Sequence, residues 1–538
     1  MRLRLSLLWL SILAASCLPL AAQPSVLTFH NDVLRTGQNL AETTLTASNV
    51  NSATFGKLYQ VTLDGVVDAQ PLYVAGVAIP SQGTHNVLIA ATENDSLYAL
   101  DADTGAQLWK VSLLASGETP SDNRGCSQVT PVIGITSTPV IELKPGTTEG
   151  AIFAVAMSKD SSGNYHQRLH KVSLATGSPL VAAVSIAGTY PGTGDASSGG
   201  YVTFDPKQYK ERSGLLMLGG VVYLAWASHC DDQPYTGWIM GYNPSTLAQT
   251  SVIDVTPNGA EGAIWGAGAG LAADSSGYIY FLDANGTFDT TLNAQGFPNQ
   301  GDYGNAFIKL SAAGGQLTVA DYFTMYNTTS ESDADEDLGS GGAMVLPDMT
   351  DANGQEQQLA IGAGKDGNIY LVNRNNMGKF NPQNDSAIYQ ELDGALPGGI
   401  WSMPAYFHGR VYFGAVSGPI RAFQFSKAVL LPSPISSTAT TFPYPGATPS
   451  ISANGTTNGI LWAVENNTPA VLHAYAATNL TEELYNTSQA ANGRDQFGAG
   501  NKFMVPTIAN GKVYVGTPNG VAAFGLLGQP AVRHGVLR

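Results

Sequence analysis

A pattern of short apolar runs separated by polar turns recurs along the chain and constrains the fold more than any other feature. Its clearest copy spans Asn86 to Leu113, with turns at 93–96 and 103–105. Runs of this length and spacing predict β-strands joined as a meander. The central run of each copy begins at one of eight positions: Leu97, Leu169, Ile239, Phe307, Ile369, Ile420, Leu472 and Val521.

Each copy is preceded by two further apolar runs, the first of which often carries Pro or Gly, as at Pro139 and Pro506. Four strands per repeat at a period of 40–50 residues or more indicate the blades of a β-propeller. The eighth copy stops after its third strand, and the segment 55–63 resembles the fourth strand of the clearest copy. An N-terminal strand that completes the last blade would remove the free edge of an open array.

We therefore predict an all-β, eight-bladed β-propeller of four-stranded antiparallel blades, closed by an N-terminal strand. Seven blades are the alternative, because the second and seventh copies are weak. The predicted divisions are a signal peptide over 1–22, an irregular segment over 23–54, one propeller over 55–527 and a tail over 528–538.

The N-terminus predicts export. Arg2 and Arg4 precede a short apolar run and then small residues, which is the order of a secretory signal, and the run is too short to span a bilayer. A lipid anchor at Cys17 is disfavoured, because no large aliphatic residue stands three positions before it. We expect a secreted or periplasmic monomer without a membrane span.

The charge balance disfavours nucleic acid as a partner. The chain has 25 basic and 41 acidic residues, giving a net charge of −16. Nothing in this balance would hold a phosphate backbone. A protein, a glycan or a small molecule remains as the expected partner.

Cys126 and Cys230 are the cysteines that remain after removal of the signal peptide. A pair in an exported chain favours a disulfide, and two unrelated buried cysteines are the alternative. Counting strands places both in connections on one face of the ring, here called the top. Most of the long irregular connections also fall at the top, where binding is usually built on a rigid scaffold.

The turn after the third run of the clearest copy carries a more specific motif. Asp101, Thr104, Gly105 and Trp109 stand at the spacing of the tryptophan-docking repeat, so the chain resembles the pyrroloquinoline-quinone (PQQ) propellers. The resemblance implies that Trp109 packs against the turn of the neighbouring blade. The segment from His30 also resembles the beginning of exported PQQ-like repeat proteins whose role is not established.

In the enzyme branch of that family, the resemblance implies PQQ and Ca²⁺ near the axis, for oxidation of alcohols or sugars. The adjacent cysteines usual in that branch are missing here. Non-catalytic relatives keep the repeats and bind proteins, and fold alone does not choose between the branches. We therefore expect a binding or interaction scaffold acting through its top face and axial channel, with a PQQ- and calcium-dependent alcohol or sugar dehydrogenase as the alternative.

Residues just before the innermost strands should ring the top of the axis. A planar quinone needs aromatic and cationic partners, and a cation needs hard oxygen ligands. The alternative is that these side chains fill the channel and bond to one another. The candidate cofactor-binding residues are Arg212, Glu261, Trp265, Asp337 and Trp401.

One acidic loop has carboxylates at alternate positions, Asp333, Asp335 and Asp337. This spacing lets a loop wrap around Ca²⁺, although the Gly and the terminal Glu of an EF-hand loop are missing. A solvated acidic loop is the alternative.

Overall fold

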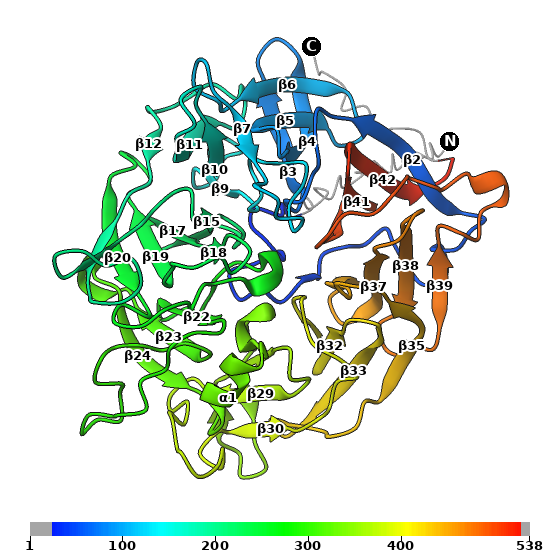
Figure 1. Ribbon diagram of the computed structural model, residues 1–538. Coiled ribbons are helices and arrows are strands. Elements are labelled where there is room, and N and C mark those ends of the chain that lie inside the picture. The colour runs from blue at the N-terminus through cyan, green and yellow to red at the C-terminus, as the bar shows by residue number, and fades with distance from the viewer. Residues whose placement is uncertain (1–23, 529–538) are drawn as a thin grey trace, which may run out of the picture.

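The computed structural model describes residues 24–528, whose strands form a ring of eight blades (Figure 1). The prediction of an all-β, eight-bladed propeller is confirmed, and the seven-bladed alternative is wrong. The weak second and seventh repeats each build a complete blade. Helices are short: α1 (Thr328–Asp333) and the 3₁₀ turns η1 (Gly266–Gly268), η2 (Ala313–Gly315), η3 (Leu338–Ser340) and η4 (Ala491–Gly493).

Blades 1 to 4 follow one another in the chain, each an antiparallel sheet whose strands run from the axis outward in sequence order. Their strands are β3 (Leu72–Ile79), β4 (Gly83–Ala91), β5 (Ser96–Asp101) and β6 (Gln107–Ser112); β9 (Val140–Leu143), β10 (Gly150–Lys159), β11 (Tyr165–Ser173) and β12 (Val184–Ser185); β16 (Leu216–Leu218), β17 (Val221–Ala225), β19 (Trp238–Tyr242) and β20 (Gln249–Asp254); and β21 (Ala272–Ala273), β22 (Tyr278–Leu282), β23 (Phe307–Ser311) and β24 (Thr318–Phe323).

Blades 5 to 8 repeat the arrangement, except that the outermost strand of blade 8 comes from the N-terminal part of the chain. Their strands are β25 (Met344–Val345), β28 (Leu359–Ala363), β29 (Ile369–Asn373) and β30 (Gln390–Leu392); β31 (Ala405–Phe407), β32 (Arg410–Gly414), β33 (Gly418–Ser426) and β35 (Ser436–Phe442); β36 (Ser450–Asn454), β37 (Thr457–Glu465), β38 (Val471–Ala476) and β39 (Glu483–Asn486); and β40 (Thr507–Ala509), β41 (Lys512–Thr517), β42 (Gly520–Leu526) and β2 (Phe55–Thr62).

Further short strands lie outside these four-stranded units. They are β1 (Gln38–Asn39), β7 (Thr119–Asp122), β8 (Val132–Ile133), β13 (Thr189–Pro191), β14 (Tyr201–Thr203), β15 (Tyr209–Lys210), β18 (Ala227–Ser228), β26 (Met349–Thr350), β27 (Glu356–Gln357) and β34 (Val429–Leu430).

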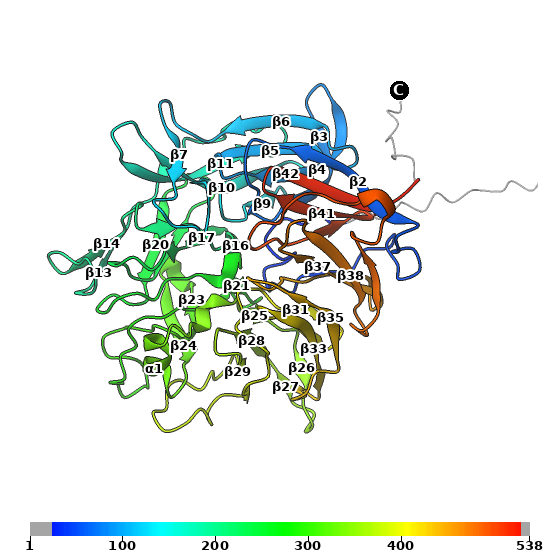
Figure 2. The same ribbon diagram turned by 45° about the vertical axis from the view of Figure 1, so that its right-hand side comes forward.

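Strand β2 closes the ring as predicted. It pairs antiparallel with β42, from Phe55 opposite Leu526 to Thr62 opposite Gly520. Figure 2 shows β2 alongside β42 at the junction of the two ends of the ring. The free edge that blade 8 would otherwise expose is covered in this way.

Burial changes from the inside of a blade to its rim. Every residue of β5 is buried, while the outermost strand β6 has exposed or half-buried residues around the buried Trp109. Inner strands pack against neighbouring blades on both faces, which explains their continuous apolar runs, whereas outer strands meet solvent. The hydrophobic core therefore lies between the blades.

The N-terminal segment 24–50 fills the axis, and it is the blue chain passing through the middle of the ring in Figure 1. Its Arg35 is fully buried and donates to the carbonyl oxygens of Phe29, at 2.8 Å, and Leu271, at 3.0 Å. Backbone hydrogen bonds join the segment to residues on the innermost strands of six blades: Tyr73, Ile141, Ala273, Val345, Tyr406 and Ile451. We call residues 24–50 the N-terminal plug.

No helix among residues 24–528 is long and apolar enough to cross a membrane. The predicted signal peptide over 1–22 and the residue Cys17 lie outside the described residues.

Candidate functional site

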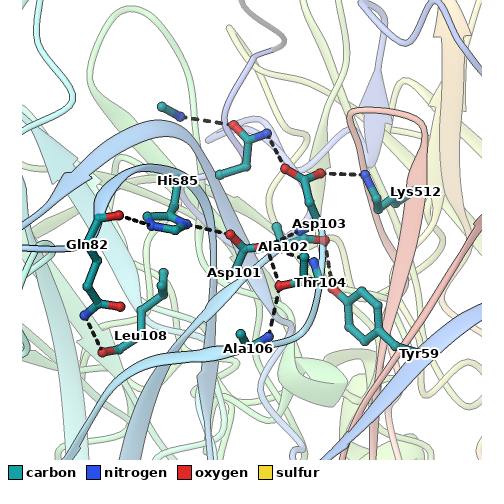
Figure 3. Close-up of polar contacts among 12 residues, drawn as sticks. Tyr59, Gln82, His85, Asp101, Ala102, Asp103, Thr104, Ala106, Leu108 and Lys512 are labelled. Carbon is teal, nitrogen blue, oxygen red and sulfur yellow. Dashed lines mark hydrogen bonds and ion pairs between the residues drawn. The ribbon is translucent and has the colours of Figure 1, made fainter. Parts of the chain in front are cut away.

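The predicted docking turn is held by Asp101. Its Oδ1 accepts hydrogen bonds from the backbone nitrogens of Asp103, at 3.0 Å, and Thr104, at 2.8 Å, while Oδ2 lies 2.6 Å from His85 Nδ1 (Figure 3). Gly105 ends the turn with a φ of +78°, and a Cβ there would lie 2.7 Å from the ring of Tyr59. The turn therefore needs glycine for its backbone conformation and for the close approach of the ring.

Trp109 makes the equivalent contact one blade further on. Its Nε1 donates to the carbonyl oxygen of Leu174 at 3.1 Å, and a Cβ on Gly177 would lie 2.7 Å from its ring. Tyr59 repeats this arrangement at the closure, where its hydroxyl donates to the carbonyl oxygen of Ala102 at 2.7 Å. At both junctions, an aromatic residue of the outermost strand covers the glycine turn of the next blade. These contacts hold blades 8, 1 and 2 together.

The candidate binding site is a cavity of about 60 Å³ near the axis at the top of the ring, here called the axial pocket. Four of the five predicted cofactor-binding residues line it, because each stands in a connection that leads into an innermost strand. Glu261 is not among the lining residues, and it accepts a hydrogen bond from Gln233 Nε2 at 2.6 Å. The lining residues are Gln128, Arg212, Asp231, Trp265, Ala267, Asp337, Ser340, Lys365, Trp401, Tyr444 and Phe503.

Arg212 is the buried cation of the axial pocket. Its side chain is 3% exposed and its guanidinium carbon lies 4.1 Å from the centre of the Phe503 ring. Its Nη2 has no hydrogen-bond partner among the described residues. Burial lowers the pKa of Arg212, opposed by the nearby acidic groups Asp68 and Glu93. An arginine in this condition is a donor left free for a ligand.

Lys365 supplies a second cation, but acidic side chains already hold it. Its Nζ lies 2.5 Å from Asp337 Oδ2 and 2.7 Å from Asp335 Oδ1. Burial works against the charged form of Lys365, yet these two carboxylates raise its pKa overall. Lys365 Nζ also lies 5.8 Å from the centre of the Trp401 ring, which contacts Tyr444 edge-on. The charge of Lys365 is therefore already compensated by carboxylates on one wall of the pocket.

The predicted cation-binding loop is only partly gathered at this wall. Asp335 and Asp337 meet at Lys365, while Asp333 is exposed at the end of α1. Within residues 24–528, no group of three or more His, Cys, Asp or Glu side chains is arranged to hold a metal ion.

Cys126 and Cys230 form a disulfide at the rim of the axial pocket, with sulfurs 2.06 Å apart and Cα atoms 5.9 Å apart. The predicted pairing is thereby confirmed. Because Gln128 and Asp231 follow these cysteines closely and line the pocket, the disulfide fixes one side of its rim. Lys210 lies beneath, with Nζ 2.8 Å from Gln128 Oε1 and 5.5 Å from the centre of the Trp265 ring.

Several carboxyl groups near the axis are buried without partners. Both side-chain oxygens of Glu211 and of Asp283 lack hydrogen bonds within the described residues. Burial raises the pKa of each well above its ordinary value, and the same holds for Glu93. Burial therefore favours the protonated, uncharged forms of these three groups.

The lining residues absent from the sequence prediction follow two rules. Phe503 stands four residues before β40, as Trp401 stands four before β31, so the rule applied to Trp401 also finds Phe503. Lys365 and Asp231 follow the second strands of their blades, which also end at the top. Residues that follow a second strand therefore predict the pocket lining as well as residues that precede a first strand.

Neither the models of protein families nor the curated protein sequences match this chain. Solved structures do. The quinohemoprotein alcohol dehydrogenase of Comamonas testosteroni aligns over 95% of this chain and 82% of its own, at 13% identity and a TM-score of 0.60. A quinohemoprotein alcohol dehydrogenase of Pseudomonas putida aligns over 96% and 82%, at 14% identity and 0.61.

A europium-containing methanol dehydrogenase aligns over 93% of this chain and 98% of its own, at 12% identity and a TM-score of 0.58. At such identities the likeness concerns the fold alone. The fold implied by the docking motif, the eight-bladed propeller of quinoprotein dehydrogenases, is therefore the fold of this chain.

Proposed function

We propose that this chain is an exported binding propeller whose axial pocket takes a small planar anion, such as an aromatic carboxylate. The observation that supports this most is the free Nη2 of the buried Arg212. An unsatisfied buried donor costs about 1–3 kcal/mol, and a ligand carboxylate would remove that cost through a charge-assisted hydrogen bond.

The rest of the axial pocket fits the same chemistry. Trp265, Trp401, Tyr444 and Phe503 offer aromatic surfaces on which a planar ligand can stack. The neighbouring acids Glu93 and Glu211 have raised pKa values, so burial favours their uncharged forms beside the guanidinium. The disulfide at the rim agrees with an oxidising compartment, which supports export.

Calorimetric titration with phthalate, and with neutral benzamide for comparison, tests the proposal. Phthalate should bind, benzamide should bind far more weakly, and Arg212→Met should weaken phthalate binding about tenfold or more. The exposed Lys427→Met is the matched loss of a positive charge and should change nothing. Equal phthalate binding by wild type and Arg212→Met would overturn the proposal, as would no binding at all.

A PQQ- and calcium-dependent alcohol or sugar dehydrogenase is the second candidate. One observation favours it: a carboxylate (Asp337), a lysine (Lys365) and an aromatic surface (Trp265) share one pocket in a fold found in quinohemoprotein alcohol dehydrogenases. The residue types suit a carboxylated quinone. The cavity of about 60 Å³ is small for either ligand, and much smaller than the pockets of about 300 Å³ or more that take ligands as large as PQQ, so a single-ring carboxylate requires a smaller movement of the rim than PQQ does. PQQ would therefore require the aromatic rim to move.

Quinone absorbance and dye reduction separate the two candidates. Wild type is mixed with PQQ and Ca²⁺ and assayed against alcohols and sugars. The dehydrogenase candidate requires bound quinone, and turnover that Asp337→Asn abolishes while phthalate binding persists. Phthalate binding with neither quinone absorbance nor turnover would leave the first proposal standing and exclude the second.

A further inference from the structure

A second and larger cavity lies away from the axis, at the outer edge of blade 5. It measures about 780 Å³ and is bounded by α1, the start of β29, the segment 383–388 and β30. We call it the acidic groove. Its lining residues are Tyr326, Asn327, Glu331, Asn368, Tyr370, Gln383, Asn384, Asp385, Ser386, Ile388, Gln390, Glu391 and Asp393.

Every charged side chain that lines the acidic groove is acidic, and no lysine or arginine is among them. Glu331 is the most informative of these residues. It is only 4% exposed, and its Oε2 has no hydrogen-bond partner among the described residues. A buried carboxyl oxygen that borders a cavity and lacks a partner indicates that a partner belongs there.

The acids of this region also act on one another. Burial, and then the charges of Asp366, Glu336 and Asp385, raise the pKa of Glu331 to about 8. Burial, and then Asp385, Asp393 and Asp366, raise the pKa of Glu391 to about 7. Positive charge placed among these groups would relieve their repulsion.

An aromatic residue stands at the mouth of the acidic groove. Tyr326 is 50% exposed although it is large and apolar, and its backbone nitrogen is tied to Asp385 Oδ1 at 2.7 Å. Tyr370 lies deeper and donates its hydroxyl to Asp366 Oδ2 at 2.5 Å. An exposed ring beside carboxylates is a recurring way to recognise an ammonium group.

We propose that the acidic groove binds an organic polycation of the polyamine class. Its ammonium groups would meet Glu331 and Glu391, and one of them would lie over the ring of Tyr326. A bare metal ion fits less well, because no three acidic, His or Cys side chains of residues 24–528 converge on one point and the cavity is far larger than an ion. This site is separate from the axial pocket and does not depend on its function.

Calorimetric titration of the full chain with spermidine at low ionic strength and about pH 8.5, above the pKa of about 8 of Glu331 and of about 7 of Glu391, tests the proposal. Wild type should bind spermidine, and Glu331→Gln and Glu391→Gln should each weaken it about tenfold, since each removes one charged hydrogen bond. Tyr326→Ala should weaken it about threefold by loss of the cation–π contact. Glu356→Gln, on the exposed β26–β27 hairpin, makes the same chemical change outside the groove and should have no effect.

Two further ligands decide what the acidic groove recognises. Neutral sorbitol should not compete with spermidine, and Ca²⁺ at equal concentration should displace little of it. Stronger binding of Ca²⁺ than of spermidine would assign the groove to a metal and overturn the proposal. Absence of spermidine binding, or equal binding by wild type and both glutamine variants, would overturn it as well. Circular dichroism of each variant confirms that a loss of binding is not a loss of folding.

Discussion

Buried polar atoms of the docking aromatic residues are hydrogen-bonded at the junctions between blades, whereas several near the axial pocket lack partners in the described part of the chain. At the junctions, Trp109 Nε1 and the Tyr59 hydroxyl donate to carbonyl oxygens of the next blade. At the axis, Arg212 Nη2 and both oxygens of Glu211 lack partners within the described residues. Unsatisfied polar groups reduce stability, so the difference separates a region that holds the ring together from one that keeps binding capacity at a cost in stability.

The largest expected loss of stability follows from a substitution at a junction between blades. Trp109→Ala should lower the free energy of unfolding by about 3 kcal/mol, because a buried ring and its hydrogen bond are lost together. Denaturant titration measures this, with the exposed Tyr201→Ala expected to change stability by less than about 0.5 kcal/mol. Phthalate binding by the Trp109 variant should remain. A large loss of binding would show that the junction and the axial pocket are not separate.

The disulfide should affect both stability and ligand binding, since it crosslinks the chain and fixes the rim of the axial pocket. Replacing both Cys126 and Cys230 by Ser should cost about 2–4 kcal/mol, as expected for a crosslink that spans 104 residues. The same variant should bind phthalate more weakly, because Gln128 and Asp231 lose their anchor. Unchanged affinity for phthalate, measured by calorimetry, would show that the disulfide has no role in the binding site.

A smaller effect is expected at the closure of the ring. Tyr59→Phe keeps the ring over Gly105 but removes the hydrogen bond to the carbonyl oxygen of Ala102, which should cost about 1 kcal/mol. Tyr201→Phe, on an exposed residue, serves as the control in the same denaturant titration. A cost no greater than that of the control would mean that the stacking alone closes the ring.

At the axis, the buried acid Glu211 should make the free energy of unfolding depend on pH. Burial raises the pKa of Glu211 well above its ordinary value of 4.5, so the folded chain keeps a proton that the unfolded chain releases. The contribution of this group to stability is therefore complete below about pH 4.5 and is lost as the pH rises toward the pKa in the folded state. Glu211→Gln carries no such proton, so its unfolding free energy should fall less between pH 5 and pH 8. Parallel pH profiles of the two proteins would contradict this.

The fold was readable from the sequence because its determinants repeat. Each of the eight third strands contains a run that begins with leucine, isoleucine, valine or phenylalanine. The segment 55–63 resembles the missing strand closely enough to reveal the closure. Four pocket residues could be predicted for a related reason, because the direction of the strands places the residues before each innermost strand around the axis. They are Arg212, Trp265, Asp337 and Trp401.

What the sequence did not reveal depends on contacts between distant segments. The N-terminal plug was expected only as an irregular segment, because residues 24–50 carry no strand periodicity and bond to many different blades. The position of Glu261 outside the pocket lining is a detail of one loop, in which it bonds to Gln233. The free Nη2 of Arg212 is likewise invisible in sequence, because the absence of a partner is a property of the assembled ring.

The N-terminal plug also has a consequence for the order of folding. The plug and β2 are synthesised first, but their partners come last: Asn39 Nδ2 bonds the carbonyl oxygen of Ile508, 469 residues further along the chain. Contacts of such sequence separation form slowly, because a long loop must close before they contribute. The ring therefore cannot close until β42 has been synthesised, and a chain lacking β42 leaves β2 unpaired. Folding of the first and last blades is coupled through the N-terminal plug and β2.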